Sequence, residues 1–105
     1  MIRKLSAILI FCFFSCASVN ERLLEEAVSN GEMLFQEKRY SEAMTVCAEA
    51  EHMARQLDDQ FCLGKIYRIM AHISNASYRY QDEIQYLKMA SDAFHNAEKP
   101  YNRLY

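Results

Sequence analysis

Apolar residues recur at spacings of three and four through almost all of the chain after residue 18, which is the pattern of amphipathic helices. A single Pro and two Gly in 105 residues leave few points at which such helices are interrupted. Polar residues at 38–41, 58–59 and 77–79 separate four apolar stripes, and Pro100 follows the last of them. We therefore predict an all-α domain of four helices with short connections.

Two sequence signals mark helix starts. Ser18 and Glu21 have the three-residue spacing of a capping box, in which each side chain accepts a hydrogen bond from the other residue's backbone N–H. This pair predicts that the first domain helix begins at Ser18. Asp58 and Asp59 offer an N-cap for the third helix.

The four stripes form two pairs that repeat with a period of 40 residues. Three matched positions carry the period: Gly31 and Ala71, Tyr40 and Tyr80, and Ala50 and Ala90. Small residues at Gly31, Ala43 and Ala50 allow two antiparallel helices to approach near the 8 Å end of the usual 8–10 Å range. We therefore predict a helix pair at residues 21–57, a second at 58–98, and the start of a third at 99–105. An antiparallel hairpin without a repeat is the alternative.

The segment from Glu37 to Ala43, with Ala50 seven residues later, resembles the tetratricopeptide repeat. Together with Cys16, the stretches 63–68 and 93–101 resemble the N-terminal part of Bacteroides-type tetratricopeptide lipoproteins. The resemblance implies that antiparallel helix pairs stack as a short solenoid.

Two repeats and a stub bury less than a stable solenoid needs, since about three repeats are the usual minimum. A last face that includes Leu87, Phe94 and Tyr86 is expected to be exposed. We predict that the chain is a truncated reading of a longer protein, or that it self-associates through its incomplete C-terminal end.

The first fifteen residues differ from the rest of the chain. Arg3 and Lys4 precede an apolar run from Leu5 to Phe14, which is about half the length that a bilayer-spanning helix needs. This pattern is typical of a signal peptide, which we place at residues 1–15. A buried N-terminal helix, simple secretion and an uncleaved anchor are the alternatives.

The residues after this run resemble the cleavage site of bacterial lipoproteins. Cys16 follows the small residue Ser15, and the resemblance implies that Cys16 is the lipidated first residue of the mature chain, with 16–20 as a linker. No Asp follows Cys16, which by analogy with enterobacterial sorting favours the outer membrane. Without Arg3 and Lys4, ten basic residues face fourteen acidic ones, a net charge of −4 that does not favour anionic lipid.

The two remaining cysteines occupy apolar helical positions. Free Cys behaves as a small apolar residue, so we predict that Cys47 and Cys62 are buried thiols, with a disulfide as the alternative. Neither has the CxxC spacing or a His neighbour that a metal site needs.

Catalytic motifs are weak in this sequence. Glu49 and His52 have the i, i+3 spacing of half a di-iron site, but neither His72 nor His95 has a Glu three residues before it. The sequence contains no GxSxG motif and no Gly-rich phosphate loop. We therefore expect no enzyme and no cofactor or metal. A helical metal-dependent enzyme acting through Glu49 and His52 is a remote alternative.

Binding is the stronger hypothesis, because in tetratricopeptide arrays the first helix of each pair lines a concave surface. Lys65, Arg68, His72 and Asn75 are spaced three, four and three apart and share one helix face. Such a face is suited to a carboxylate or an acidic peptide, and Phe35 offers an apolar anchor. A solvated polar face is the alternative. The groove positions implied by the resemblance are Val28, Glu32, Phe35, Lys65, Arg68, His72 and Asn75.

The sequence thus favours a membrane-anchored scaffold that binds an unidentified protein or peptide in the bacterial cell envelope. The nearly balanced charges give no reason to expect nucleic acid as a partner. The alternative is the periplasmic sensor region of a longer repeat-containing regulator, with the run from Leu5 to Phe14 uncleaved. The positions assigned to repeat packing are Gly31, Tyr40, Ala43, Ala50, Ala71, Tyr80 and Ala90.

Overall fold

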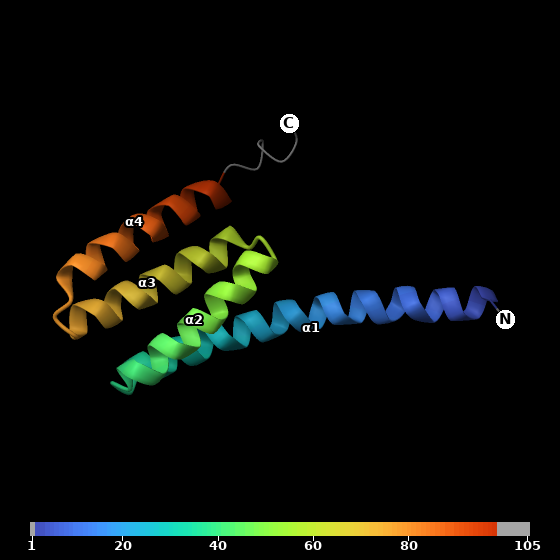
Figure 1. Ribbon diagram of the computed structural model, residues 1–105, viewed down its shortest axis with the longest axis horizontal. Helices are drawn as coiled ribbons and strands as arrows, with labels where there is room; N and C mark the ends of the chain where they lie inside the picture. The colour runs from blue at the N-terminus through green and yellow to red at the C-terminus, as the bar shows by residue number, and fades with distance from the viewer. Residues whose placement is uncertain (1, 99–105) are drawn as a thin grey trace.

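The computed structural model describes the backbone of residues 2–98 and the side chains of residues 19–98. Its elements are the helices α1 (Ile2–Gln36), α2 (Tyr40–Gln56), α3 (Gln60–Ala76) and α4 (Tyr80–Ala97), and the described part of the chain contains no strand. The all-α prediction is therefore confirmed. Consecutive helices run antiparallel, and the N-terminal part of α1 extends beyond the other three helices (Figure 1).

The three connections between helices have one geometry, repeated every 20 residues. Lys38, Asp58 and Tyr78 have φ values of 64°, 52° and 61°, in the left-handed region. In each connection the next residue's N–H donates to the carbonyl five residues before it, the Schellman helix ending. These bonds join Arg39 to Leu34 (2.9 Å), Asp59 to Ala54 (2.9 Å) and Arg79 to Ser74 (2.8 Å). Two such units make up the 40-residue period of the sequence.

One of the two predicted helix starts is observed. The Asp59 carboxylate accepts a hydrogen bond from the Cys62 N–H at 3.0 Å, so Asp59 caps α3 as expected. The prediction for Ser18 is wrong, because α1 begins at Ile2 and runs through Ser18 without a break. The physical reason is that no Gly or Pro lies between Ile2 and Asn30 to end the helix of the apolar run.

The core is centred on α3. Ten of its seventeen residues are buried, and it packs against α2 and α4 and also contacts α1. By contrast, Ala90 and Ala93 are the only buried residues among those described in α4. The outer face of α4 is open: Leu87 is 45% exposed, as predicted, and Ile84 is 54% exposed. Phe94 and Tyr86 are instead half-buried against the core.

Both glycines lie where helices approach closely. A Cβ atom on Gly31 would lie 3.0 Å from the Cys47 Sγ on α2, so the nearest neighbour is Cys47 rather than Ala43 or Ala50. Those two alanines are completely buried on the same helix. A Cβ atom on Gly64 would lie only 2.5 Å from ring carbons of Phe94, which makes this the tighter approach.

The two cysteines of the helix pairs are free and buried, as predicted. Burial raises the pKa of Cys47 to about 11. The pKa of Cys62 is also raised to about 11, first by burial and then by the hydrogen bond with Asp59. Because the thiolate is the nucleophilic form, neither thiol is reactive near neutral pH.

Within the described residues, no helix combines the length and the apolar character needed to cross a bilayer.

Candidate functional site

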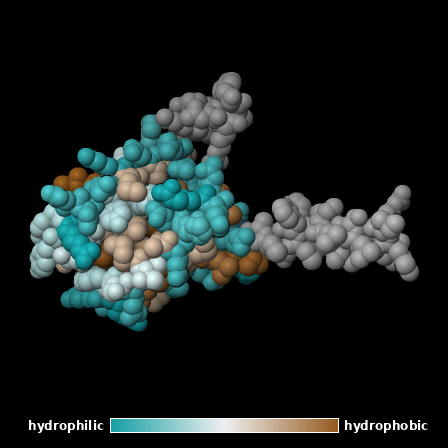
Figure 2. Space-filling model, in the orientation of Figure 1, coloured by the Kyte–Doolittle hydropathy of each residue, from teal (hydrophilic) through white to brown (hydrophobic). Residues whose placement is uncertain are grey.

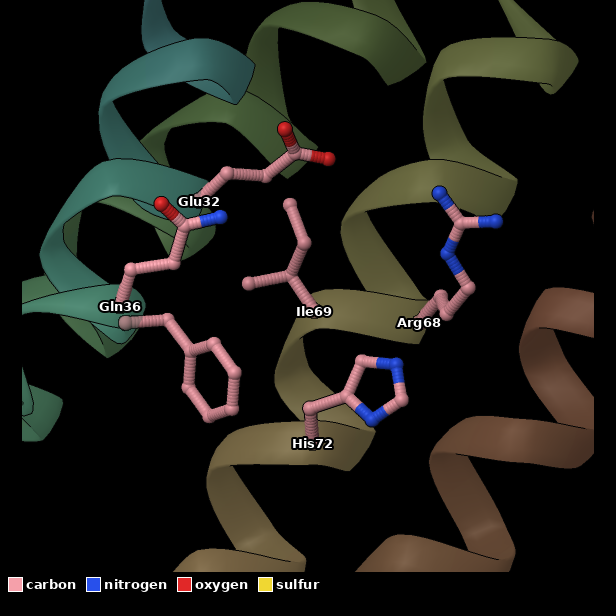
Figure 3. Close-up of a pocket in the computed structure, with 6 residues that line it drawn as sticks. Glu32, Gln36, Arg68, Ile69 and His72 are labelled. Atoms are coloured by element: carbon pink, nitrogen blue, oxygen red, sulfur yellow. The ribbon is translucent and has the colours of Figure 1, made fainter.

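An open depression of about 370 Å³ lies between α1 and α3 (Figure 3). Each of these two helices contributes three side chains, so the depression is formed by the first helices of the two pairs. The residues that line it are Glu32, Phe35, Gln36, Arg68, Ile69 and His72. In Figure 3, Glu32 and Gln36 face Arg68 and His72, with Ile69 between the two helices.

The floor and one wall of the depression are apolar. Ile69 is only 3% exposed and belongs to the core, so it closes the depression from below. Phe35 is half-buried, and its ring lies 5.9 Å from the His72 ring, centroid to centroid, and 5.8 Å from that of Tyr40. An apolar ligand group therefore meets a preformed aromatic surface.

The rim of the depression carries charge. Arg68 and Glu32 are both exposed at its edge. Arg39 and Arg55 form ion pairs with neighbouring glutamates, whereas Arg68 has no hydrogen bond or ion pair among the side chains of residues 19–98. Its guanidinium N–H groups are thus available to a ligand, and carboxylates are the partners they match best.

Four of the seven predicted groove residues line this depression, namely Glu32, Phe35, Arg68 and His72. Val28 is 6% exposed and packs in the core. The Lys65 Nζ lies 5.1 Å from the centre of the Phe61 ring, and Asn75 is exposed but does not line the depression. Sequence reasoning missed Gln36 and Ile69, although both adjoin predicted positions in the sequence.

The positions assigned to repeat packing do not all have equivalent surroundings. The small residues Gly31, Ala43, Ala50, Ala71 and Ala90 are buried. Tyr40 is half-buried against Phe35, whereas Tyr80 is 54% exposed and meets only Tyr78, at 6.4 Å between ring centres. The difference arises because the residue forty positions after Phe35 is Asn75, which offers no ring.

A second polar cluster joins α2 to α3. The Tyr67 hydroxyl donates to the Glu51 Oε2 at 2.5 Å, and the Arg55 Nη2 donates to the Tyr67 oxygen at 2.7 Å. Burial, followed by the hydrogen bond to Glu51, raises the pKa of Tyr67 to about 12. These groups satisfy one another, so the cluster is better explained as a link between helices than as a ligand site.

Glu49 and His52, the residues of the remote metal alternative, are both exposed on α2. In the part of the chain that the structure describes, no three His, Cys, Asp or Glu side chains come together in a way that could hold a metal ion. The side chain of Cys16 and residues 99–105, the predicted lipidation site and third repeat, lie outside the described residues.

Comparisons with protein-family models, with curated proteins and with solved structures found no match for this chain. The functional assignment therefore rests on the residues and their arrangement.

Proposed function

We propose that this chain is a non-enzymatic, tetratricopeptide-like scaffold that binds a peptide segment of a partner protein in the depression between α1 and α3. We further propose that lipid on Cys16 holds it at the bacterial cell envelope, on the outer membrane. The observation that carries the binding proposal is the combination of an apolar floor at Ile69, an aromatic wall at Phe35 and an unpaired guanidinium at Arg68.

The packing order of the helices supports the stacked-pair arrangement. Each helix packs against the next in the chain, and α1 also contacts α3, so that first helices are neighbours. The three identical turns give every unit the same length, which a regular solenoid requires. Buried small residues in α2, α3 and α4 let the helices pack closely.

The chemistry of the depression indicates the kind of peptide. A carboxylate of the ligand accepts charge-assisted hydrogen bonds from Arg68, while a neighbouring apolar side chain packs against Phe35 and Ile69. Glu32 on the opposite rim favours an N–H donor or a cation at the other end of the bound segment. The preferred ligand is thus a short segment with an acidic residue next to an apolar one.

The proposal is tested with a displayed library of random short peptides selected on the purified protein. We expect enrichment of acidic–apolar sequences, and we expect Arg68→Ala to weaken their affinity by roughly 5- to 10-fold, because one exposed charge-assisted contact is lost. Raising the salt concentration weakens binding in the same direction.

Arg79→Ala is the matched control, since Arg79 is an exposed arginine in the turn between α3 and α4 and lies outside the depression. Its affinity for the selected peptides stays within about twofold of the unmodified protein. Failure to enrich any peptide, or equal losses for the two variants, contradicts the proposed site.

A further inference from the structure

Large apolar side chains are exposed where α1 leaves the helix bundle. Val19 is 38% exposed and Leu23 is 46% exposed, and because they are four residues apart they lie on one face of α1. The α2–α3 turn and the beginning of α3 are at this same end of the bundle (Figure 1). Phe61, in the first turn of α3, is 57% exposed. Figure 2 shows hydrophobic surface at the point where α1 emerges.

This apolar surface continues from α1 onto α2. A cavity of about 200 Å³ lies between Asn20 on α1 and the C-terminal end of α2, where Met53, Gln56 and Leu57 line it. Met53 and Leu57 are half-buried, so their side chains are partly open to this cavity. We call the surface formed by Val19, Leu23, Leu57 and Phe61 the anchor-proximal surface.

We infer that the anchor-proximal surface rests in the boundary between headgroups and acyl chains of the membrane that holds Cys16. The inference depends on the proposed lipidation of Cys16. Cys16 precedes Val19 by three residues, a distance of about 5 Å along a helix and about 10 Å in an extended chain. A lipid chain on Cys16 therefore keeps Val19 and Leu23 within the depth of the interfacial region.

The side chains at this end suit a lipid interface. The Lys65 ammonium lies over the Phe61 ring at 5.1 Å, an arrangement in which an aromatic ring enters the interface and a lysine reaches the lipid phosphates. Exposed acidic residues at Glu21, Glu25 and Asp58 oppose attraction to an anionic surface. The matching partner is therefore a zwitterionic bilayer, contacted through apolar side chains rather than through net charge.

The natural chain contains no Trp, so a single introduced Trp reports on one position only. The lipidated protein is prepared from a lipoprotein-processing bacterium as Leu23→Trp, Phe61→Trp and the control Tyr78→Trp. Tyr78 is 80% exposed and lies in the turn at the opposite end of the bundle (Figure 1). Each variant is reconstituted into phosphatidylcholine vesicles with and without bromine on the acyl chains near the headgroup.

We expect brominated lipid to quench fluorescence by about twofold or more in Leu23→Trp and Phe61→Trp, and by less than about 20% in Tyr78→Trp. Unquenched Trp at positions 23 and 61 in protein that floats with the vesicles overturns the inference while leaving the lipid anchor intact. Equal quenching at all three positions also overturns it, because the whole domain then lies on the membrane.

Two further outcomes have separate meanings. Protein that does not float with the vesicles contradicts the lipid anchor and, with it, the inference. Protein that is dimeric, with Trp at 23 and 61 shielded but not quenched, shows that a second copy covers the surface and likewise overturns the inference. Circular dichroism checks that the variants fold, and the two positions report independently because they lie on different helices.

Discussion

Replacement of Gly64 by Ala is expected to lower the free energy of unfolding by about 1–3 kcal/mol, although alanine is the better helix former. The added Cβ would meet ring carbons of Phe94 at 2.5 Å, closer than any van der Waals contact allows. Phe94 is itself packed against the Phe61 ring, with 5.8 Å between ring centres, so relieving the overlap disturbs that pair as well. Urea unfolding followed by circular dichroism measures the change.

A double-mutant cycle identifies the cause. In a Phe94→Ala background the overlap is absent, so Gly64→Ala becomes neutral or stabilises the protein by up to about 1 kcal/mol. Gly31→Ala is the matched glycine control, because its Cβ would lie 3.0 Å from a single movable atom, the Cys47 Sγ, and the expected loss is smaller. A stabilising Gly64→Ala in the presence of Phe94 contradicts the close packing of α3 on α4.

Stability is expected to fall as the pH rises from about 9 to about 11, with Cys47 as one identifiable source. Burial raises the pKa of this thiol from 9.0 to about 11 in the folded chain. Between these values the unfolded chain has lost the proton that the folded chain keeps, so each pH unit costs up to about 1.4 kcal/mol of stability. The contribution is fully present below pH 9, and about 2 kcal/mol of it is lost by pH 11.

The Cys47→Ala variant isolates this contribution from Tyr67 and Cys62, which act in the same direction. Urea unfolding at pH 8 is expected to find the variant less stable, because it loses a buried sulfur atom, and the difference shrinks or reverses by pH 10.5. Val46→Ala serves as the non-titrating control on α2, and its effect stays constant with pH. A pH-independent effect of Cys47→Ala contradicts a buried thiol at this position.

Much of the fold follows from local sequence patterns. Spacings of three and four place the helices, polar interruptions place the turns, and Asp59 caps α3 as its position predicts. The turns themselves are less legible, because Lys38 and Tyr78 occupy left-handed positions that usually carry Gly. The failed start at Ser18 has the same origin, since a local capping signal does not stop a helix whose preceding residues also favour helix.

The candidate site was predictable where helical spacing decides and unpredictable where packing does. Arg68 and His72 are four residues apart on α3 and face the depression together. Lys65 has the same spacing but lies beside Phe61, an aromatic contact that the groove pattern does not take into account. Val28 is drawn into the core because it is apolar and lies one turn from Leu24, the most buried residue described in α1.

The central claim is that the first helices of the two pairs lie side by side and form the binding depression. Nuclear Overhauser effects between the rings of Phe35 and His72 test it most directly, since the ring centres are 5.9 Å apart and the two residues are on α1 and α3. The Phe35–Tyr40 ring pair, at 5.8 Å, belongs to the first helix pair and provides an internal reference. We predict cross-peaks for both ring pairs. A Phe35–Tyr40 cross-peak without a Phe35–His72 cross-peak would contradict the claim.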